Sequence, residues 1–266
     1  MRPEILSAGN LSEAVSTPPD WHLPRWRGRA LVVGCGGIGA ALLADLAHRC
    51  PRLELVGATR HPVPLDAPGL AGMPVLPLDL ERDASVMALA ERLADGAPLR
   101  LVIHTAGLLQ DGELKPEKRL AQVRRRHLER SFTVNAFAPL LLAQAVEPLL
   151  PRDQPFHFAS LSARVGSIGD NRLGGWYAYR AAKAAQNQLL RTLALEWQRR
   201  LPLGCVSLLH PGTTATRLSA PFRASVPERQ LFSPERAAGH LLDVLEQRRA
   251  EDSGGFWAWD GQRVPW

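Results

Sequence analysis

Lysine, tyrosine and cysteine are scarce in this chain of 266 residues, which has three Lys, two Tyr and three Cys. The cysteines, Cys35, Cys50 and Cys205, are odd in number and none forms a Cys-x-x-Cys pair. This pattern gives no support to a disulfide framework or a zinc site, and we expect no metal. The few remaining lysines and tyrosines therefore become informative wherever they occur together.

Long hydrophobic runs are also missing. No stretch approaches the 18 or so consecutive apolar residues of a membrane-spanning helix, and the start Met1-Arg-Pro-Glu lacks the apolar segment of a signal peptide. We therefore predict a cytoplasmic protein with no membrane partner. At 45% hydrophobic and 22% charged residues, the composition is that of an ordinary globular protein with a sizeable core.

The positive charge is almost entirely arginine. Of 32 basic residues only three are Lys, which leaves 29 Arg, and the net charge is +6. The densest patch is Arg124-Arg125-Arg126-His127. A nucleic-acid-binding surface is one explanation of this charge. Arginine replaces lysine throughout the chain, however, and Ala, Leu and Pro are abundant, so the base composition of the genome is the explanation we favour. We predict no nucleic-acid partner.

A glycine-rich turn lies near the start of the chain. Ala30-Leu-Val-Val-Gly34-Cys-Gly36-Gly37-Ile38-Gly39 passes from an apolar strand-like stretch, through four glycines, into the Ala/Leu-rich segment Ala40–Arg49. Glycines between a strand and a helix let backbone N–H groups approach a pyrophosphate without an intervening Cβ. The pattern predicts nucleotide binding, with a plain tight turn as the alternative.

Apolar strands alternate with helical stretches along the rest of the chain. This alternation predicts an α/β fold, a Rossmann-like doubly wound parallel β-sheet with helices on both faces. The expected strands are Ala30–Gly34, Leu53–Ala58, Pro74–Leu78, Leu99–His104, Pro155–Ala159, Cys205–Leu209 and Phe256–Trp259. The expected helices are Gly37–Arg49, Ala84–Asp95, Pro116–Pro148 with a bend, Trp176–Arg200 and Pro234–Gln247. Residues 1–28 contain Pro18-Pro19 and little periodicity, so we expect an N-terminal arm followed by a single domain, 29–266.

Tyr179 and Lys183 stand four residues apart in Tyr-Ala-Tyr-Arg-Ala-Ala-Lys, a stretch of helical composition. On a helix they share a face. A lysine ammonium beside a phenol favours the phenolate and brings its pKa toward the range of proton exchange at neutral pH. The alternative is two groups on a solvated helix face.

The order of these motifs resembles the short-chain dehydrogenase/reductase family from Ala30 to the C-terminus. The glycine turn is followed by Asp79-Leu80, His104-Thr105-Ala106-Gly107, Val134-Asn135, a strand ending near Ser160 and Ser162, Tyr179xxxLys183, and His210-Pro211-Gly212 with Thr216. The segment from Ser162 to Arg180 and the tail Trp257–Trp266 are similar to the narrower bacterial C-factor-like branch.

The chain departs from the family pattern at three places. Two residues separate Gly34 and Gly37, whereas the family usually has three, so the Gly34, Gly36, Gly39 spacing fits the general dinucleotide fingerprint instead. His104 and Thr105 replace two asparagines. Ala163 occupies the position, sixteen residues before Tyr179, where relatives with a similar insertion carry the catalytic serine. Ser162 is the nearest hydroxyl and our first choice, with Ser160 second.

The resemblance implies a mechanism and a cofactor site. Tyr179 would exchange a proton with the substrate oxygen, Ser162 would hydrogen-bond that oxygen, and Lys183 would hold the nicotinamide ribose and lower the pKa of Tyr179. Asn135 would bend the long helix and hold a water that links Lys183 to solvent. The implied cofactor residues are Gly34, Gly36, Gly37, Ile38, Gly39, Arg60, Asp79, Leu80, Ala106, Gly107, Asn135, Tyr179, Lys183, Pro211, Gly212, Thr214 and Thr216.

The sequence favours NADP(H) over NAD(H). Thr59-Arg60 follows the second strand where an Asp or Glu would accept from a ribose 2′-hydroxyl, and Arg60 can instead bind a 2′-phosphate. The expected substrate is a small carbonyl compound or alcohol, beneath a lid at Thr213–Leu231. The rival interpretation is a nucleotide-binding regulator with little turnover. Apolar stretches at Phe137–Val146 and Leu189–Leu195 predict a homodimer or homotetramer.

Overall fold

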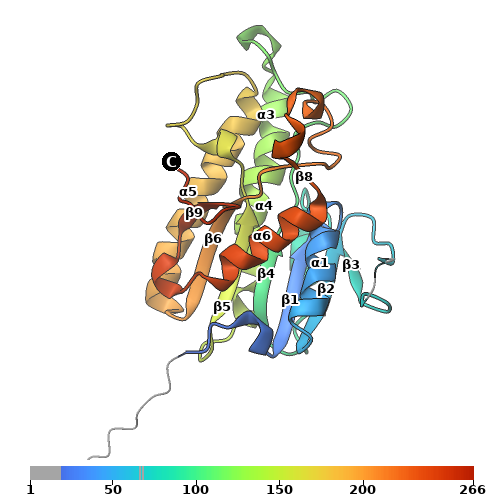
Figure 1. Ribbon diagram of the computed structural model, residues 1–266, viewed down its shortest axis with the longest axis vertical. Helices are drawn as coiled ribbons and strands as arrows, with labels where there is room; N and C mark the ends of the chain where they lie inside the picture. Colours follow the sequence, from blue (N-terminus) through green and yellow to red (C-terminus); the bar gives the residue numbers. More distant parts are fainter. Residues whose placement is uncertain (1–18, 66, 68) are drawn as a thin grey trace, which may run out of the picture.

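A seven-stranded parallel sheet forms the centre of the molecule (Figure 1). The computed structural model describes residues 19–65, 67 and 69–266. The strand order is β3-β2-β1-β4-β5-β6-β9. These strands span Gly28–Val33 (β1), Leu53–Thr59 (β2), Val75–Pro77 (β3), Leu99–His104 (β4), Phe156–Leu161 (β5), Gly204–His210 (β6) and Gly255–Ala258 (β9). Because β1 pairs with both β2 and β4, the strand order reverses there, and the Rossmann-like prediction is confirmed.

Helices cover both faces of this sheet, as Figure 1 shows. On one face α1 (Ile38–Arg49) packs against α6 (Pro234–Glu246), and their leucines share a buried cluster with strand residues. On the other face lie α2 (Asp83–Arg92), α4 (Ala138–Val146) and α5 (Tyr177–Arg200). There Trp197 of α5 packs edge-on against Phe156 and Phe158 of β5. Each such fully buried side chain contributes about 1.5–3 kcal/mol.

The long helix predicted over Pro116–Pro148 is wrong in its first part. Only a 3-10 turn, Leu120–Gln122, forms before α3 begins at Arg125. The cause is a tertiary contact: the Glu117 carbonyl accepts a 2.5 Å hydrogen bond from Trp176 N–H, and the Glu117 carboxylate accepts from Ala178 N–H. The segment is used to satisfy the first N–H groups of α5 and so does not continue as a helix.

The predicted bend in this helix is present. Helix α3 (Arg125–Phe132) passes into a π-helical turn, Thr133–Phe137, and then into α4. Asn135 sits in that turn. π-turns inside α-helices widen the backbone at one point and occur often at functional sites.

The stretch Arg125–Leu149, which contains this bend, is long and apolar enough to cross a membrane by length and composition alone, because an 18-residue window within it has a mean hydropathy of 1.2. Half of that window is buried inside the fold, as expected of a core helix beside a sheet. The cytoplasmic location stays a prediction.

The part of the N-terminal arm within the described residues packs against the domain. Trp21 and Trp26 are buried, and both rings contact His157 of β5 at centroid distances of 5.4 Å. The Arg100 guanidinium lies 4.3 Å above the Trp26 ring. The boundary at residue 28 stays a prediction, but this packing favours an earlier start of the domain, near Pro19. Residues 1–18 lie outside the described part of the chain.

Two short strands were not predicted. Thr213–Thr214 (β7) and Leu231–Phe232 (β8) pair in parallel and close the two ends of the segment where a lid is expected. The intervening residues contain two 3-10 turns, Arg223–Ser225 and Glu228–Gln230. Two-residue strands carry too little pattern to be recognised in a sequence.

Candidate active site

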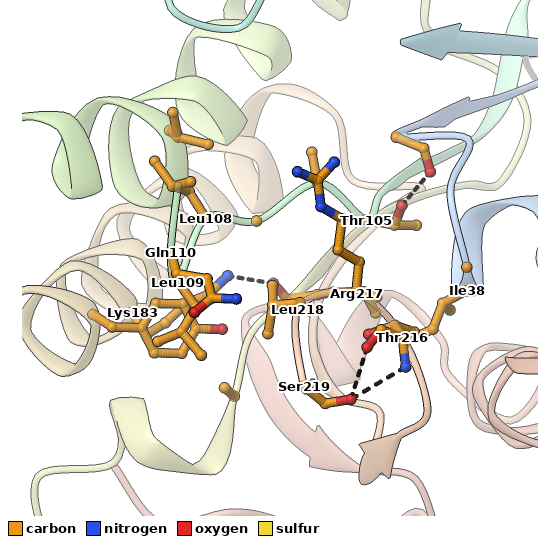
Figure 2. Close-up of a pocket in the computed structure, with 18 of the residues that line it drawn as sticks. Ile38, Thr105, Leu108, Leu109, Gln110, Lys183, Thr216, Arg217, Leu218 and Ser219 are labelled. Carbon is orange, nitrogen blue, oxygen red and sulfur yellow. Dashed lines mark hydrogen bonds between the residues drawn. The ribbon is translucent and has the colours of Figure 1, made fainter. Parts of the chain in front are cut away.

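A cavity of about 1200 Å³ opens at the carboxyl ends of the central strands. Its wall is built from the turn after β1, the ends of β2, β4, β5 and β6, and the start of α5. Figure 2 shows side chains from these distant parts, among them Ile38, Thr105 and Lys183, around one space with the segment Thr216–Ser219 beside it. In parallel α/β sheets, ligands bind at this edge, next to the point where the strand order reverses.

The glycine turn between β1 and α1 is shaped for close approach. A Cβ on Gly39 would lie 1.8 Å from the Gly34 carbonyl oxygen, so only glycine allows α1 to begin there. A Cβ on Gly36 would meet nothing within 4 Å, and Gly36 lines the cavity. Gly34, Gly36, Gly37 and Ile38 all border the cavity, whereas Gly39 supports the turn from behind.

Thr105 explains how the strand ends are braced without the family's asparagine. Its hydroxyl contacts the Val33 carbonyl at 3.0 Å and the Gly34 carbonyl at 2.7 Å, which ties the end of β4 to the glycine turn. Ala106 and Gly107 follow it in the chain and form part of the cavity wall.

Tyr179 and Lys183 lie on the buried face of α5, so a solvated helix face is excluded. Their exposed fractions are 7% and 2%, and both line the cavity. Lys183 Nζ lies 5.8 Å from the centre of the Tyr179 ring. It donates 2.9 Å hydrogen bonds to the Leu161 carbonyl and to Gln186 Oε1.

The pKa of Tyr179 moves opposite to our expectation. Burial raises the pKa of the phenol above its ordinary value of 10, because the phenolate is the charged form. Burial also lowers the pKa of the Lys183 ammonium to about 7. Desolvation therefore outweighs the attraction between phenolate and ammonium in this protein, and Tyr179 is a neutral phenol at pH 7.

The two candidate serines have different surroundings. Ser162 lines the cavity and donates a 2.6 Å hydrogen bond to Asn187 Oδ1 on α5. Ser160 is fully buried beneath it, where it contacts Gln186 and His104. Ala163 also lines the cavity. Of the two hydroxyls, Ser162 is therefore the one at the cavity.

Asn135 is held from two sides. Its Oδ1 accepts from Leu108 N–H at 2.9 Å, and its Nδ2 donates to the Leu108 carbonyl and to the Ser131 carbonyl. These bonds fix the π-turn to the loop after β4. The side chain is fully buried, and it is Val134 of the same turn that borders the cavity.

Arg60 forms part of a charged cluster at the end of the cavity next to β2. Its Nη2 lies 2.7 Å from Glu81 Oε1 and 3.6 Å from Asp79 Oδ1. Arg130 of α3 reaches the same carboxylate at 3.2 Å and pairs with Asp111 at 2.6 Å. Arg60, Glu81, Arg130 and Leu80 line the cavity, whereas Asp79 does not.

The loop after β6 forms the remaining wall. Four residues expected to bind the cofactor, Pro211, Gly212, Thr214 and Thr216, line the cavity. The Thr214 hydroxyl is buried and has no hydrogen-bond partner among the described residues. The Ser219 hydroxyl donates to the Thr214 carbonyl at 2.6 Å and accepts from Thr216 N–H, which shapes the turn.

Sequence reasoning missed several cavity residues. Trp176 adopts φ 52°, the left-handed region, directly after Gly174 and Gly175 with φ 62° and 66°. Its ring contacts Tyr179 and, at 5.1 Å, Phe222 of the expected lid. Among the described residues it is the one non-glycine with positive φ, and such strain is concentrated at functional sites. The sequence feature that could have indicated this left-handed turn is the glycine pair Gly174-Gly175 directly before Trp176.

These features fit a dinucleotide. The cavity exceeds the roughly 300–1,000 Å³ typical of small-ligand pockets. The open space at Gly36, the unpartnered Thr214 hydroxyl and the arginines near β2 offer N–H, hydroxyl and cationic partners for phosphate and ribose oxygens.

Comparisons with known proteins agree with this geometry. Residues 29–227 match the model of the short chain dehydrogenase family. The chain is 35% identical over 203 residues to 1-hydroxy-2-glutathionyl-2-methyl-3-butene dehydrogenase of Rhodococcus sp. strain AD45, covering 74% of this chain and 82% of that protein. It is 35% identical over 140 residues to the C-signal protein of Myxococcus xanthus, covering 52% and 78%.

The fold matches solved structures of the same family. The NADPH-bound carbonyl reductase from chicken fatty liver superposes with a TM-score of 0.75 at 25% identity, covering 91% of this chain and all of that one. Family match, site and fold agree: the chain belongs to the short-chain dehydrogenase family, in its C-factor-like branch, and is an NAD(P)-dependent oxidoreductase that acts on small molecules.

Proposed function

We propose that the protein interconverts a carbonyl compound and a primary or secondary alcohol, with Tyr179 as the acid and base. The observation that carries the proposal is that Tyr179 and Lys183 lie buried in the same cavity as the glycine turn. A nicotinamide dinucleotide bound there supplies or accepts the hydride.

Tyr179 donates a proton to the substrate oxygen in the reducing direction. Its raised pKa keeps the phenol protonated, which suits a proton donor. In the oxidising direction the same group accepts the proton of the alcohol, after the phenol has lost its own. Ser162, at the cavity, donates to the same oxygen once its bond to Asn187 is exchanged for the substrate.

Lys183 hydrogen-bonds the nicotinamide ribose hydroxyls. In its ammonium form it also places a positive charge next to the Tyr179 phenol. Two of its three N–H donors are engaged by Leu161 and Gln186, and one stays available. Asn135 fixes the loop after β4 through Leu108 and thereby supports Ala106 and Gly107 at the cofactor.

NADP(H) is the preferred cofactor in this proposal. Arg60 and Arg130 form a pair of guanidinium groups at the β2 end, held together by Glu81. Neither Thr59 nor Arg60 can accept from a ribose 2′-hydroxyl as an Asp or Glu would. The carbonyl reductase from chicken fatty liver, which matches over 91% of this chain, binds NADPH.

The remaining pocket residues give the substrate an apolar wall. Leu109, Val165, Leu173, Trp176, Leu218 and Phe222 border the cavity. The expected lid contributes Leu218 and Phe222, and Trp176 meets Phe222 from the opposite side. We therefore propose a carbonyl compound with an apolar body.

A second candidate function is a nucleotide-binding regulator that turns over little. Two observations favour it: Ala163 stands where the resemblance expects the catalytic serine, and the C-signal protein of Myxococcus xanthus is 35% identical over 140 residues. In that case Tyr179 and Lys183 serve cofactor binding alone.

Self-association stays a further proposal. Most apolar residues of Phe137–Val146 and Leu189–Leu195 are buried within the subunit, which accounts for their hydrophobicity. Phe137 and Leu195 remain about half exposed, at 47% and 46%, and they are the contacts we expect between subunits in a homodimer or homotetramer.

A turnover screen tests the proposed function. Purified protein is mixed with NADPH and a panel of aldehydes and ketones, and with NADP⁺ and matching alcohols, a glutathionyl alcohol among them. Oxidation of NADPH with at least one carbonyl compound is the expected result. Tight NADPH binding with no turnover across the panel supports the regulator instead.

A further inference from the structure

The buried side of α5 below Tyr179 carries polar residues where the core face of a helix is normally apolar. Gln186 is fully buried and contacts Ser160 on β5, and Ser160 in turn contacts His104 on β4, both of them also fully buried. Polar groups in such a position stay only if their hydrogen bonds are satisfied. The bonds of this group end at Lys183.

The hydrogen bonds run in one direction. In its ammonium form Lys183 Nζ can only donate, so the amide oxygen of Gln186 faces it, at 2.9 Å. The Gln186 amide nitrogen then donates to Ser160 Oγ at 2.7 Å and to the Leu161 carbonyl at 3.2 Å. Because Ser160 Oγ accepts from Gln186, its own hydrogen is free for His104 Nδ1, 3.1 Å away.

His104 fixes the far end of this chain. Burial lowers its pKa to about 3, so the imidazole is neutral at pH 7 and its Nδ1 can accept. A neutral acceptor at that end holds the Ser160 hydroxyl in one orientation, and Ser160 in turn prevents the Gln186 amide from rotating.

The surroundings of Lys183 contain little charge to balance its own. His104 from β4 and Tyr179 from the same helix are neutral, and Asn135 of the π-turn carries no charge. Arg164, on the 3-10 turn packed against α5, pairs with Asp170 at 3.4 Å. Among the described residues, no carboxylate forms a salt bridge with Lys183, so the Gln186 and Leu161 oxygens are the groups that stabilise its ammonium.

We propose that Gln186 is a positioning residue for Lys183: its amide oxygen, oriented by Ser160 and His104, fixes the ammonium beside Tyr179 and stabilises its protonated form. The catalytic meaning of this role rests on the proposed function. The effect on Lys183 itself does not, because it follows from the hydrogen bonds alone.

The low lysine content allows a direct measurement. The chain has three lysines, so protein labelled with 13C at lysine Cε gives three signals, and Lys115→Arg and Lys118→Arg variants identify the signal of Lys183. Titration of this signal reports the pKa of Lys183 in the intact protein without any substrate.

The test variants are Gln186→Met, similar in size without an amide, and Gln186→Glu. Gln188→Met, on the exposed side of the same helix, is the control.

Loss of the amide oxygen in Gln186→Met should lower the pKa of Lys183 by about one unit, since a hydrogen bond to a charged group is lost. A carboxylate in Gln186→Glu should raise it by more than one unit. Ser160→Ala should lower the pKa of Lys183 less than Gln186→Met does. The Ser160→Ala/Gln186→Met double variant should have the same Lys183 pKa as Gln186→Met alone, because Ser160 acts through Gln186. Gln188→Met should titrate as the wild type.

The inference is overturned if Lys183 titrates as in the wild type in either Gln186 variant that folds. Turnover rates with NADPH and a carbonyl substrate distinguish a failure of the Gln186 role from a failure of the proposed function. The pH at which turnover is half-maximal should move with the lysine pKa. If the pKa moves and no carbonyl compound is turned over, the role of Gln186 at Lys183 stands and the proposed carbonyl–alcohol reaction fails.

Discussion

The Ser162 hydroxyl donates a 2.6 Å hydrogen bond to Asn187 Oδ1, one turn beyond Lys183 on α5. The strand end that carries the serine is thereby attached to the helix that carries the tyrosine and lysine. Both substrate-facing groups of the proposed mechanism are therefore attached to α5, and Asn187 makes this contact alongside the bonds from Lys183 and Gln186 to the end of β5.

Ser162→Ala should reduce turnover on the order of 10²-fold or more, because the developing charge on the substrate oxygen loses a donor. Ser160→Ala should change the rate by less than tenfold, since that hydroxyl is sealed beneath the site. Steady-state rates with NADPH and a carbonyl substrate decide between them. An active Ser162→Ala enzyme beside an inactive Ser160→Ala enzyme contradicts our choice.

Tyr179→Phe should separate binding from chemistry. Removal of one hydroxyl leaves the shape of the site unchanged, so NADPH affinity should stay near that of the wild type while turnover falls on the order of 10²- to 10⁴-fold. Tyr177, 41% exposed on another side of the helix, is the matched control, and Tyr177→Phe should keep its activity. Full turnover by Tyr179→Phe would disprove the mechanism.

Glu81 should weaken binding of the 2′-phosphate. Its carboxylate engages both Arg60 and Arg130 and repels an incoming phosphate. Glu81→Gln should therefore tighten NADPH binding several-fold and leave NADH binding unchanged, whereas Arg60→Ala should weaken NADPH binding more than NADH binding. Fluorescence titration with both cofactors measures this, and equal or tighter binding of NADH by the wild type refutes the preference.

The two glycines of the turn should respond differently to a methyl group. Gly39→Ala places a Cβ against the Gly34 carbonyl and should lower the melting temperature by several degrees or prevent folding. Gly36→Ala should fold normally, because its Cβ meets no protein atom within 4 Å, and yet weaken NADPH binding by filling the cavity. Thermal melts and cofactor titrations of both variants test the pair.

Stability should fall as the pH drops below 6.5. Burial lowers the pKa of His104 and His157 to about 3 and that of His210 to about 4, so the unfolded chain binds protons that the folded protein cannot. Between pH 6.5 and 4 the free energy of unfolding therefore decreases with decreasing pH, by up to about 1.4 kcal/mol per pH unit for each histidine.

His157 provides the test of this pH dependence. Neither ring nitrogen has a partner among the described residues, and the ring packs against both Trp21 and Trp26, which also contact each other. His157→Phe should keep that packing. It should also make the free energy of unfolding depend less steeply on pH, because the unfolded chain then binds one proton fewer. Urea unfolding at several pH values between 4 and 6.5 measures the slope, and an unchanged slope in His157→Phe argues against the assignment.

Local patterns predicted most of the fold. The bounds of β4 agree at both ends with those expected, and the glycine turn lies at the carboxyl end of β1 as predicted, because these features depend on residues adjacent in the chain. The start of α3 was not predictable from local sequence. Glu117 is not helical because its oxygens accept hydrogen bonds from backbone N–H groups at the start of α5, about 60 residues later in the sequence. Tertiary contacts override helical composition there.

Sequence motifs indicated side chains that the structure places at one cavity, whereas the chemistry of these side chains was less predictable. Tyr179, Lys183 and Ser162 all reach the cavity. The direction of the tyrosine pKa shift was wrong, because burial acts on the phenol more strongly than the neighbouring lysine does. The polar network of Gln186, Ser160 and His104 joins three separate elements, and no spacing in the sequence connects them.

The parallel pairing of all seven main strands has a kinetic consequence. Each neighbouring pair is separated by a crossover, so no two strands of this sheet can form as a hairpin. Folding must close long loops before the central strands gain their contacts, which predicts slow refolding and a collapsed intermediate with uncovered strand edges. Refolding after dilution from urea should therefore yield more active protein at low protein concentration.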